Sequence, residues 1–196
     1  MTNLNKILSL ARQNNGYLAN KKVKAMGIST RYLSDLVKSK KIEKIKPGLY
    51  LYEGNMPDDF FETLYNTSGI FSHTTALHFH NLTDRTPIKL DITVANDYKG
   101  SLQNNKKVNL FYVKKNLYAL GQTEIKSPQG LPIKVYDIER TICDIIKSEK
   151  KIETEIFVSS LQKYARYKNK KLNILLKYAS LFGITRKVED KLRILL

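Results

Sequence analysis

NKKVKAMGISTRYLSDLVKSKKIEKIKPGLYLY, residues 20–52, is the stretch that decides the predicted fold of the amino-terminal region. Residues 21–26 favour a short helix that Asn20 can cap. Gly27-Ile28-Ser29 has the length and the glycine of the turn that joins the two helices of a helix-turn-helix unit. A third helix is expected over residues 30–38, because its apolar side chains recur on one face.

A β-hairpin is predicted after the third helix. Residues 41–46 and 49–52 alternate in hydrophobicity on either side of Lys46-Pro47-Gly48, which is typical of two strands joined by a tight turn. A further helix is predicted to begin near Thr2 and to end before Gly16, since Leu4, Ile7, Leu8 and Ala11 recur at helical spacing. The order helix, helix, turn, helix, hairpin predicts a winged helix-turn-helix domain over residues 1–54.

The third helix is the predicted reading element of this domain. A helix that enters the major groove of DNA presents its first turns to the base edges, and arginine can make a bidentate contact with guanine. Lysines beside such a helix contact phosphates, which position the protein without reading sequence. The alternative is a small helical domain with a solvated, lysine-rich face that binds protein instead of DNA. The predicted DNA-binding residues are Ser29, Thr30, Arg31, Ser34 and Lys38 on the third helix, Lys44 and Lys46 on the hairpin, and Lys21 and Lys22 on the second helix.

The charge distribution supports a polyanionic partner. The chain has 34 Lys and Arg against 18 Asp and Glu, a formal net charge of +16. Residues 1–53 and residues 147–196 each have a net charge of +8, whereas residues 54–146 are neutral. A lysine bias caused by genome composition would spread lysine evenly, so the two basic ends favour a nucleic-acid partner.

Composition excludes several classes of protein. The chain has 196 residues, of which 42% are hydrophobic, which is too many for an intrinsically disordered protein. No apolar run approaches the ~20 residues of a membrane span, and no export signal is recognised, so we expect a cytoplasmic protein without a membrane partner. Cys143 is the only cysteine, which excludes an internal disulfide and a cysteine-based metal cage.

Residues 55–196 predict a second domain, so that the whole chain is expected to be of the α+β class. A mixed sheet is predicted within residues 70–135, where the strands are expected at 89–94, 108–113, 122–126 and 131–135. Two helices are expected on the way to this sheet, over residues 58–65 and 72–80. A helical bundle is predicted over residues 137–196, with helices at 137–146, 153–167, 170–181 and 185–195.

Three groups of residues in this domain are candidate chemical sites. His73, His78 and His80 do not share one helix face, so we expect ordinary histidines and no metal site. Asp91, Glu124 and Lys126 resemble the carboxylate and lysine set of a Mg²⁺-dependent nuclease, which is an alternative function, although their spacing is long. Cys143 has apolar neighbours and is expected to be a buried, unreactive thiol. No catalytic residue, metal or cofactor is therefore predicted.

Interactions between residues close along the chain are sufficient to explain the sequence of the predicted helix over residues 137–146. Asp137 can cap its amino-terminal end, where acidic residues interact favourably with the helix dipole. Arg140 and Asp144 stand at i and i+4, the spacing of a helical ion pair. The basic carboxyl-terminal residues that follow leave three alternatives open: a wider DNA footprint, an acidic or RNA-binding partner, or a solvated face.

Several motifs, taken in order, resemble the AbiEi antitoxins of abortive-infection, type IV toxin–antitoxin systems. In the amino-terminal part they are Gly27-Ile28-Ser29 and Lys46-Pro47-Gly48-Leu49-Tyr50. The others are Ser72-His73-Thr74-Thr75-Ala76-Leu77, His80-Asn81-Leu82, Asp91-Ile92-Thr93-Val94 and Tyr136-Asp137-Ile138-Glu139-Arg140-Thr141-Ile142-Cys143-Asp144. The resemblance covers essentially the whole chain.

The resemblance implies a non-enzymatic, two-domain protein of phage defence. Such antitoxins repress their own operon by binding inverted repeats in its promoter through the winged helix. Their carboxyl-terminal domain counteracts a nucleotidyltransferase-like toxin, which need not involve a stable complex. The resemblance implies no metal and no cofactor, and we expect a monomer in solution with more than one protomer on the operator. The DNA-binding residues that it carries over are Ser29, Thr30, Arg31, Ser34, Lys38, Lys44 and Lys46.

Overall fold

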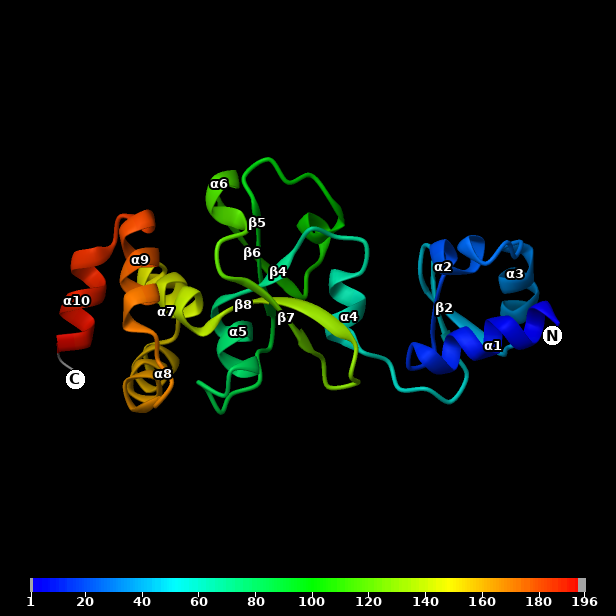
Figure 1. Ribbon diagram of the computed structural model, residues 1–196, viewed down its shortest axis with the longest axis horizontal. Coiled ribbons are helices and arrows are strands. Elements are labelled where there is room, and N and C mark those ends of the chain that lie inside the picture. The colour runs from blue at the N-terminus through cyan, green and yellow to red at the C-terminus, as the bar shows by residue number, and fades with distance from the viewer. Residues whose placement is uncertain (1, 194–196) are drawn as a thin grey trace. The chain divides into compact units, whose positions relative to one another are not determined.

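The computed structural model describes residues 2–193. Contacts divide the chain into two compact units, each with its own core, and Figure 1 shows the elements of both. The first unit comprises the chain up to Tyr65 together with Lys126–Ile133, and the second comprises Asn66–Ile125 together with the chain from Lys134 onward. None of the helices within the described residues is both long and apolar enough to cross a membrane.

Within its described residues, the first unit is built from four helices and a small antiparallel sheet. The strands lie in the order β1-β3-β2, and β1 pairs with β3 from Tyr17 to Ala19. The strand β1 is absent from the sequence prediction, because its three residues are too few for a period of two to be recognised. The elements are α1 (Asn3–Gln13), β1 (Tyr17–Ala19), α2 (Asn20–Ala25), α3 (Arg31–Lys38), β2 (Ile42–Lys46), β3 (Leu49–Tyr52) and α4 (Asp59–Leu64).

The predicted turn between α2 and α3 is confirmed. Gly27 adopts a φ of +71°, a left-handed conformation that glycine reaches without strain, and its N–H donates to the carbonyl of Lys24 (2.9 Å). Ile28 is buried at the corner, and its N–H donates to the carbonyl of Val23 (3.3 Å). The turn therefore fixes the direction of α3 through both backbone hydrogen bonds and burial of one apolar side chain.

The core of this unit joins α1, α2 and α3 to the sheet. Ile7, Leu18, Val23 and Leu33 are fully buried in it. Burial of each such aliphatic side chain is worth about 1.5–3 kcal/mol, so that the three helices are held by packing more than by helix propensity.

The division between the units differs from the predicted boundary after residue 54. Phe61 and Tyr65, which lie on and just after α4, pack against a second cluster that contains Tyr17 and Leu49. Asp58, the residue that caps α4, donates its N–H to the hydroxyl of Tyr17 (2.7 Å). These contacts place α4 with the first unit.

The second unit contains a five-stranded mixed sheet in the order β6-β5-β4-β8-β7. The strand β5 runs parallel to β6 and antiparallel to β4, and β4 runs parallel to β8. The two-residue strand β4 was not predicted, whereas the hairpin turn at residues 127–130 is confirmed by the bond from the N–H of Gly130 to the carbonyl of Ser127 (2.8 Å). The strands are β4 (Ile70–Phe71), β5 (Leu90–Ala95), β6 (Val108–Val113), β7 (Gln122–Lys126) and β8 (Pro132–Tyr136).

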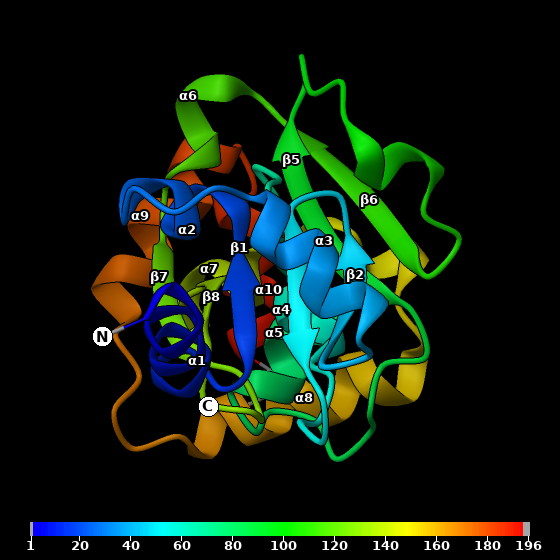
Figure 2. The ribbon, with the colours of Figure 1, turned by 90° about the vertical axis from the view of Figure 1, so that its right-hand side faces the viewer.

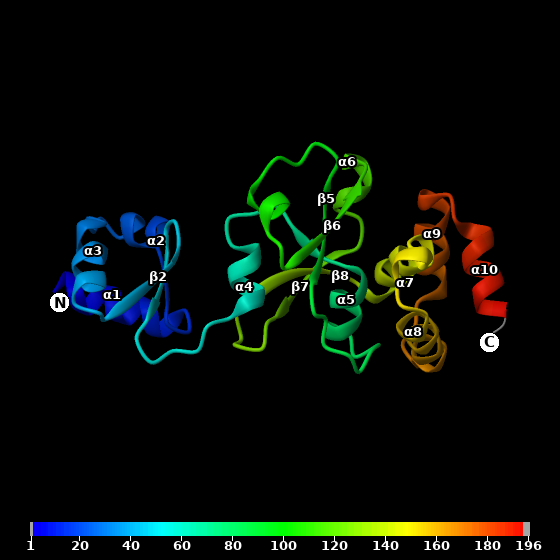
Figure 3. The same ribbon diagram turned by 180° about the vertical axis from the view of Figure 1, so that it is seen from behind.

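Helices pack beside this sheet and form the predicted bundle. Figure 3 shows α7, α8, α9 and α10 grouped together, and α5 also contacts α7. Asp137 caps α7 as predicted, accepting from the N–H of Arg140 (2.7 Å). The last helix was expected to reach residue 195, and residues 194–196 lie outside the described residues. The helices are α5 (His73–Phe79), α6 (Lys115–Tyr118), α7 (Ile138–Lys147), α8 (Thr154–Arg166), α9 (Leu172–Phe182) and α10 (Thr185–Arg193), and the short 3₁₀ helices are η1 (Ser101–Asn104) and η2 (Glu149–Lys151).

The mixed α+β class is confirmed by these elements. The largest apolar core of the second unit joins α7 to α8, α9 and α10, with Ile142, Tyr164, Leu175 and Val188 fully buried. Cys143 lies in the same core, and burial raises the pKa of its thiol to about 12. Its thiolate is therefore not formed near neutral pH, which agrees with the prediction of an unreactive thiol.

Candidate nucleic-acid interface

The outer face of α3 carries polar and basic side chains. Leu33 and Leu36 are buried, whereas Arg31, Ser34 and Lys38 are exposed on the other side of the helix. Helix α3 packs against β2, as Figure 2 shows, so that its buried face is fixed by the sheet. The apolar face of α3 predicted from the sequence is buried, so its polar face is exposed and can contact a partner.

The amino-terminal turn of α3 is not fully capped by side chains. The Ser29 hydroxyl accepts a hydrogen bond from the N–H of Arg31 (3.3 Å). Thr30 makes no capping bond with its side chain and is only partly exposed. The helix begins without an acidic residue in its first turn, so the positive end of its dipole is not compensated there. A phosphate oxygen approaching this end would be stabilised.

Tyr32 lies on the same helix, at the edge of this polar face. Its side chain is 42% exposed, so it does not belong to the core. An exposed tyrosine between Thr30 and Leu33 offers a ring for apolar contact and a hydroxyl for a hydrogen bond. The sequence could not assign it, because a tyrosine next to an apolar stripe fits both the edge of the core and the surface.

The basic residues of α2 are also accessible. Lys21 and Lys22 are exposed, and the ammonium of Lys22 donates to the side-chain oxygen of Asn14. Helix α2 precedes the turn, so that its lysines are carried on the same helix-turn-helix unit as Arg31.

The two hairpin lysines differ in their surroundings. Lys44 is exposed on β2. The ammonium of Lys46 instead donates to the backbone carbonyl of Glu62 at the end of α4, and burial lowers its pKa. The interpretation of Lys46 as a phosphate contact is therefore not supported by its geometry, because its charge is directed toward α4.

The hairpin turn itself is held against the body of the unit. The carbonyl of Gly48 accepts from the N–H of Asn20 (2.9 Å) and from the hydroxyl of Tyr65 (3.1 Å). A hairpin tip held at two points does not extend freely toward a ligand. The exposed strand β2, rather than the turn, is the part of the hairpin that can reach a partner.

No basic side chain of the first unit forms an ion pair within the described residues. Six ion pairs with N···O within 4 Å occur among the described residues, and all of them lie in the second unit. Arg31, Lys38 and Lys44 therefore have no carboxylate partner within the described chain. A surface with free cations attracts polyanions, and neutralising each phosphate releases counterions.

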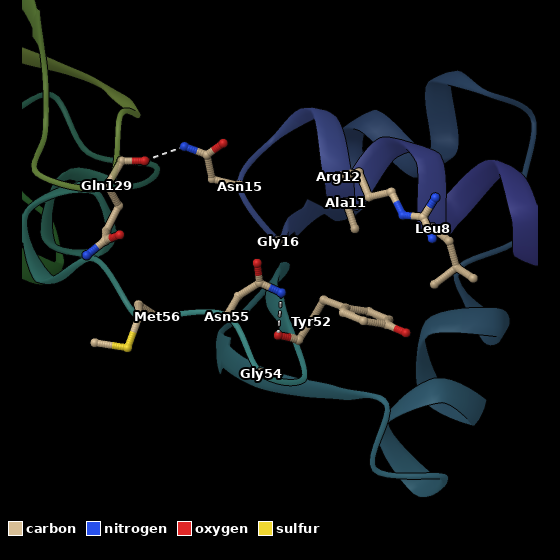
Figure 4. Close-up of a pocket in the computed structure, with 10 residues that line it drawn as sticks. All are labelled: Leu8, Ala11, Arg12, Asn15, Gly16, Tyr52, Gly54, Asn55, Met56 and Gln129. Atoms are coloured by element: carbon tan, nitrogen blue, oxygen red, sulfur yellow. Dashed lines mark hydrogen bonds between the residues drawn. The ribbon is translucent and has the colours of Figure 1, made fainter.

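A pocket of about 480 Å³ also lies in the first unit, between α1 and the segment after β3 (Figure 4). Asn15 donates its side-chain N–H to the carbonyl of Gln129, and Asn55 bonds back to the carbonyl of Tyr52 (3.1 Å). Gly16 has a φ of +86°, and a Cβ there would come within 2.7 Å or less of the Asn55 side chain. This glycine allows α1 to end as predicted and the segment after β3 to pass close beside it.

The alternative nuclease residues are not brought together. Asp91 lies on β5 and Glu124 on β7, and the strands β4 and β8 separate them in the sheet. Lys126 lies on β7 with Glu124, on the far side of the same two strands from Asp91. Asp91 is buried, and its carboxylate accepts from the N–H of Thr74 (3.0 Å) and from the side chain of Asn109 (2.9 Å). It therefore caps α5 from the neighbouring strand.

The three histidines are likewise separate. His73 is buried, its Nδ1 lies 2.9 Å from the Ser72 hydroxyl, and its ring stacks on Phe111 with a centroid separation of 3.5 Å. His80 contacts the carbonyl of Tyr136 through Nε2 (2.6 Å). No group of three or more His, Cys, Asp or Glu side chains able to hold a metal ion occurs within residues 2–193.

Comparisons with known proteins address the first unit and the fold. Residues 5–52 match a family model described as a transcriptional regulator, AbiEi antitoxin, which confirms the resemblance from within α1 to the end of β3. No curated protein sequence matches the chain significantly. The fold resembles the crystal structure of the RV2827C protein from Mycobacterium tuberculosis, with a TM-score of 0.61 and 12% sequence identity. That similarity covers 89% of this chain and 69% of the other chain.

Proposed function

We propose that the protein is a sequence-specific DNA-binding transcriptional autorepressor and antitoxin of a type IV toxin–antitoxin system. The observation that carries the proposal is the exposed, uncompensated face of α3 with Arg31, within a segment that matches a family of transcriptional-regulator antitoxins. In this role the protein acts in the cytoplasm in abortive infection, a form of phage defence. Its second unit counteracts a nucleotidyltransferase-like toxin, without the need for a stable complex.

The first unit binds DNA by inserting α3 into the major groove. Arg31 contacts guanine, and Ser34, Thr30 or Ser29 contacts a base edge or a phosphate. Lys21, Lys22, Lys38 and Lys44 contact phosphates on either side of the groove. Bound protomers on inverted repeats then cover the promoter and block transcription. More than one protomer on the operator follows from the two-fold repetition of such a site.

The proposal is tested by DNA binding with the full-length chain. A fluorescently labelled duplex from the promoter upstream of the gene is titrated against a duplex of scrambled sequence at one salt concentration. The promoter duplex is expected to bind at least about 100-fold more tightly. The variant Lys99→Ala, which removes an exposed charge from the second unit, is the control and should bind as the wild type does. Equal affinity for both duplexes would contradict sequence-specific repression.

A second experiment separates the two activities. The proposal predicts a neighbouring gene for a nucleotidyltransferase-like protein, and this gene is expressed in cells together with wild-type antitoxin or Arg31→Ala. Arg31→Ala is expected to restore growth as the wild type does and to lose repression of a promoter fusion, because α3 lies in the first unit. Loss of growth rescue at an unchanged protein level would contradict the assignment of antitoxicity to the second unit.

A further inference from the structure

A pocket of about 550 Å³ in the second unit is lined by more basic than acidic side chains. Its walls come from β6, from the end of α7 with η2, and from α9 and α10. Five basic side chains line it: Arg140, Lys147, Lys150, Lys151 and Lys187. The pocket has the size of a small-molecule site, which typically occupies about 300–1,000 Å³.

The acidic residues of the lining are already engaged. Asp144 pairs with Arg140, Nε to Oδ1 3.0 Å, and Glu149 pairs with Lys191, 2.6 Å. Within residues 2–193, none of the four lining lysines forms an ion pair. The pocket therefore concentrates four ammonium charges that the described chain does not neutralise.

The helix dipole explains only part of this cluster. Lys147 is the last residue of α7, and Lys150 and Lys151 follow it, at a helix end where cations are favoured. Lys187 comes from α10, a separate helix, and Arg140 from the first turn of α7, where the dipole disfavours a cation. The helix dipole therefore does not explain the positions of Lys187 and Arg140. Packing of separate elements brings them to the same pocket.

Arg140 supplies a second, independent observation. Its side chain is fully buried, and its guanidinium lies between the rings of Tyr136 and Phe182, 4.0 and 4.4 Å from their centroids. Nε and Nη1 have acceptors, but Nη2 has none among the described residues. A buried donor without an acceptor is unfavourable, and Arg140 is one of the residues that line this pocket.

The histidine of the pocket lining is surrounded by the same basic side chains. His73 lines the pocket, stacked on Phe111. Burial, together with the smaller effect of the charges of Arg140, Lys151 and Lys147, lowers the pKa of His73 to about 3. The imidazole is therefore neutral near pH 7 and adds no charge, whereas the lysines around it create a positive potential.

We propose that this pocket binds the oligophosphate group of a small ligand of the size of a nucleoside triphosphate. Phosphate oxygens match the unsatisfied Nη2 of Arg140, because guanidinium and phosphate form strong, charge-assisted hydrogen bonds. A terminal phosphate can enter a pocket whose inner wall contains a buried arginine, whereas the phosphates of a continuous nucleic-acid strand are flanked by nucleosides on both sides. The site is independent of the face of α3 that is proposed to bind DNA.

The test is calorimetric titration of the full-length protein with ATP, GTP and tripolyphosphate at 150 mM salt without added Mg²⁺. Adenosine is the uncharged comparison. The variant Lys147→Gln/Lys187→Gln removes two charges from the pocket, and Lys168→Gln/Lys177→Gln removes two exposed charges elsewhere in the same unit. The pocket variant is expected to lose about tenfold in affinity for tripolyphosphate or ATP, and the control variant less than twofold. Thermal unfolding of each variant checks that it is folded.

The comparison of ligands identifies what is recognised. Equal binding of tripolyphosphate and ATP assigns the site to the oligophosphate alone, and tighter binding of ATP assigns it to a nucleotide. The proposal is overturned if the wild type binds neither, if the control variant loses as much affinity, or if a single-stranded oligonucleotide without a terminal phosphate displaces ATP. Arg31→Ala should retain ATP binding. Failure of the wild type to bind its promoter would overturn the proposed function and leave this result unchanged.

Discussion

Arg140 and Asp144, one helical turn apart on α7, form an ion pair in the interior of the second unit, with Nε of Arg140 3.0 Å from Oδ1 of Asp144. The same guanidinium donates through Nη1 to the carbonyls of Leu117 and Leu120, at 2.9 and 2.7 Å. One side chain thereby ties α7 to the backbone around α6. Burial raises the pKa of Asp144 to about 6, against the opposing effect of Arg140.

Arg140→Met is expected to lower the free energy of unfolding by about 3–5 kcal/mol, because it leaves the Asp144 carboxyl and two backbone carbonyls buried without their partner. Arg140→Met/Asp144→Leu should lose less than the sum of the two single variants, with a coupling of about 1–3 kcal/mol. Urea unfolding of all four proteins measures this. Strict additivity would show that the pair is not coupled in the folded protein.

The stability of the protein should fall in acid partly because of His73. The folded-state pKa of about 3 lies below the ordinary value of 6.5, so between these values the unfolded chain binds a proton that the folded chain does not. The contribution of neutral His73 to the free energy of unfolding is complete above pH 6.5. It is lost as the pH falls toward 3. Between pH 7 and pH 4.5 it amounts to about 2.5 kcal/mol.

His73→Asn should remove this part of the pH dependence. Asparagine tolerates the positive φ of +46° at this position and does not titrate. Urea unfolding of wild type and variant at the two pH values gives the difference, and the opposite effect of Asp144, which gains its proton in the folded state, is present in both proteins. A wild type and a variant with the same pH dependence would contradict the buried, neutral imidazole.

Arg31→Ala should weaken binding to the promoter duplex by about 1–3 kcal/mol, because a bidentate contact to one base is lost. The loss on scrambled DNA should be smaller, since Arg31 is exposed on α3 and is proposed to read sequence. Anisotropy titrations with both duplexes measure the two losses. Equal losses would assign Arg31 to a phosphate.

Lys44→Ala and Lys46→Ala should differ in their effect on the salt dependence of DNA binding. Lys44 is exposed, so its loss should reduce the slope of log K against log salt by about 0.9. Lys46 donates to the Glu62 carbonyl and should leave the slope unchanged, while its loss weakens the attachment of α4. Titrations at four salt concentrations give the slopes, and a reduced slope for Lys46→Ala would show that its ammonium reaches DNA.

Residues close together along the chain were sufficient to predict many of the turns and helices. Gly27 and Ile28 predicted the turn before α3, and Asp137 predicted the start of α7, because a left-handed glycine and a capping carboxylate act within three or four residues. The apolar face with Leu33 and Leu36 likewise predicted which side of α3 is buried. These properties depend on neighbours along the chain, so the sequence by itself determined them.

Tertiary structure decided the properties that depend on distant segments. The strands β1 and β4 exist only through pairing with β3 and β5, and three or two residues carry no period of their own. Whether Lys46 faces solvent was settled by α4, which lies 16 residues away along the chain. The i,i+4 spacing predicted the pair of Arg140 and Asp144, but only packing of α9 and the chain around α6 buried it and left Nη2 without an acceptor among the described residues. Burial and electrostatic potential sum over all elements that surround a group, and no local pattern contains that sum.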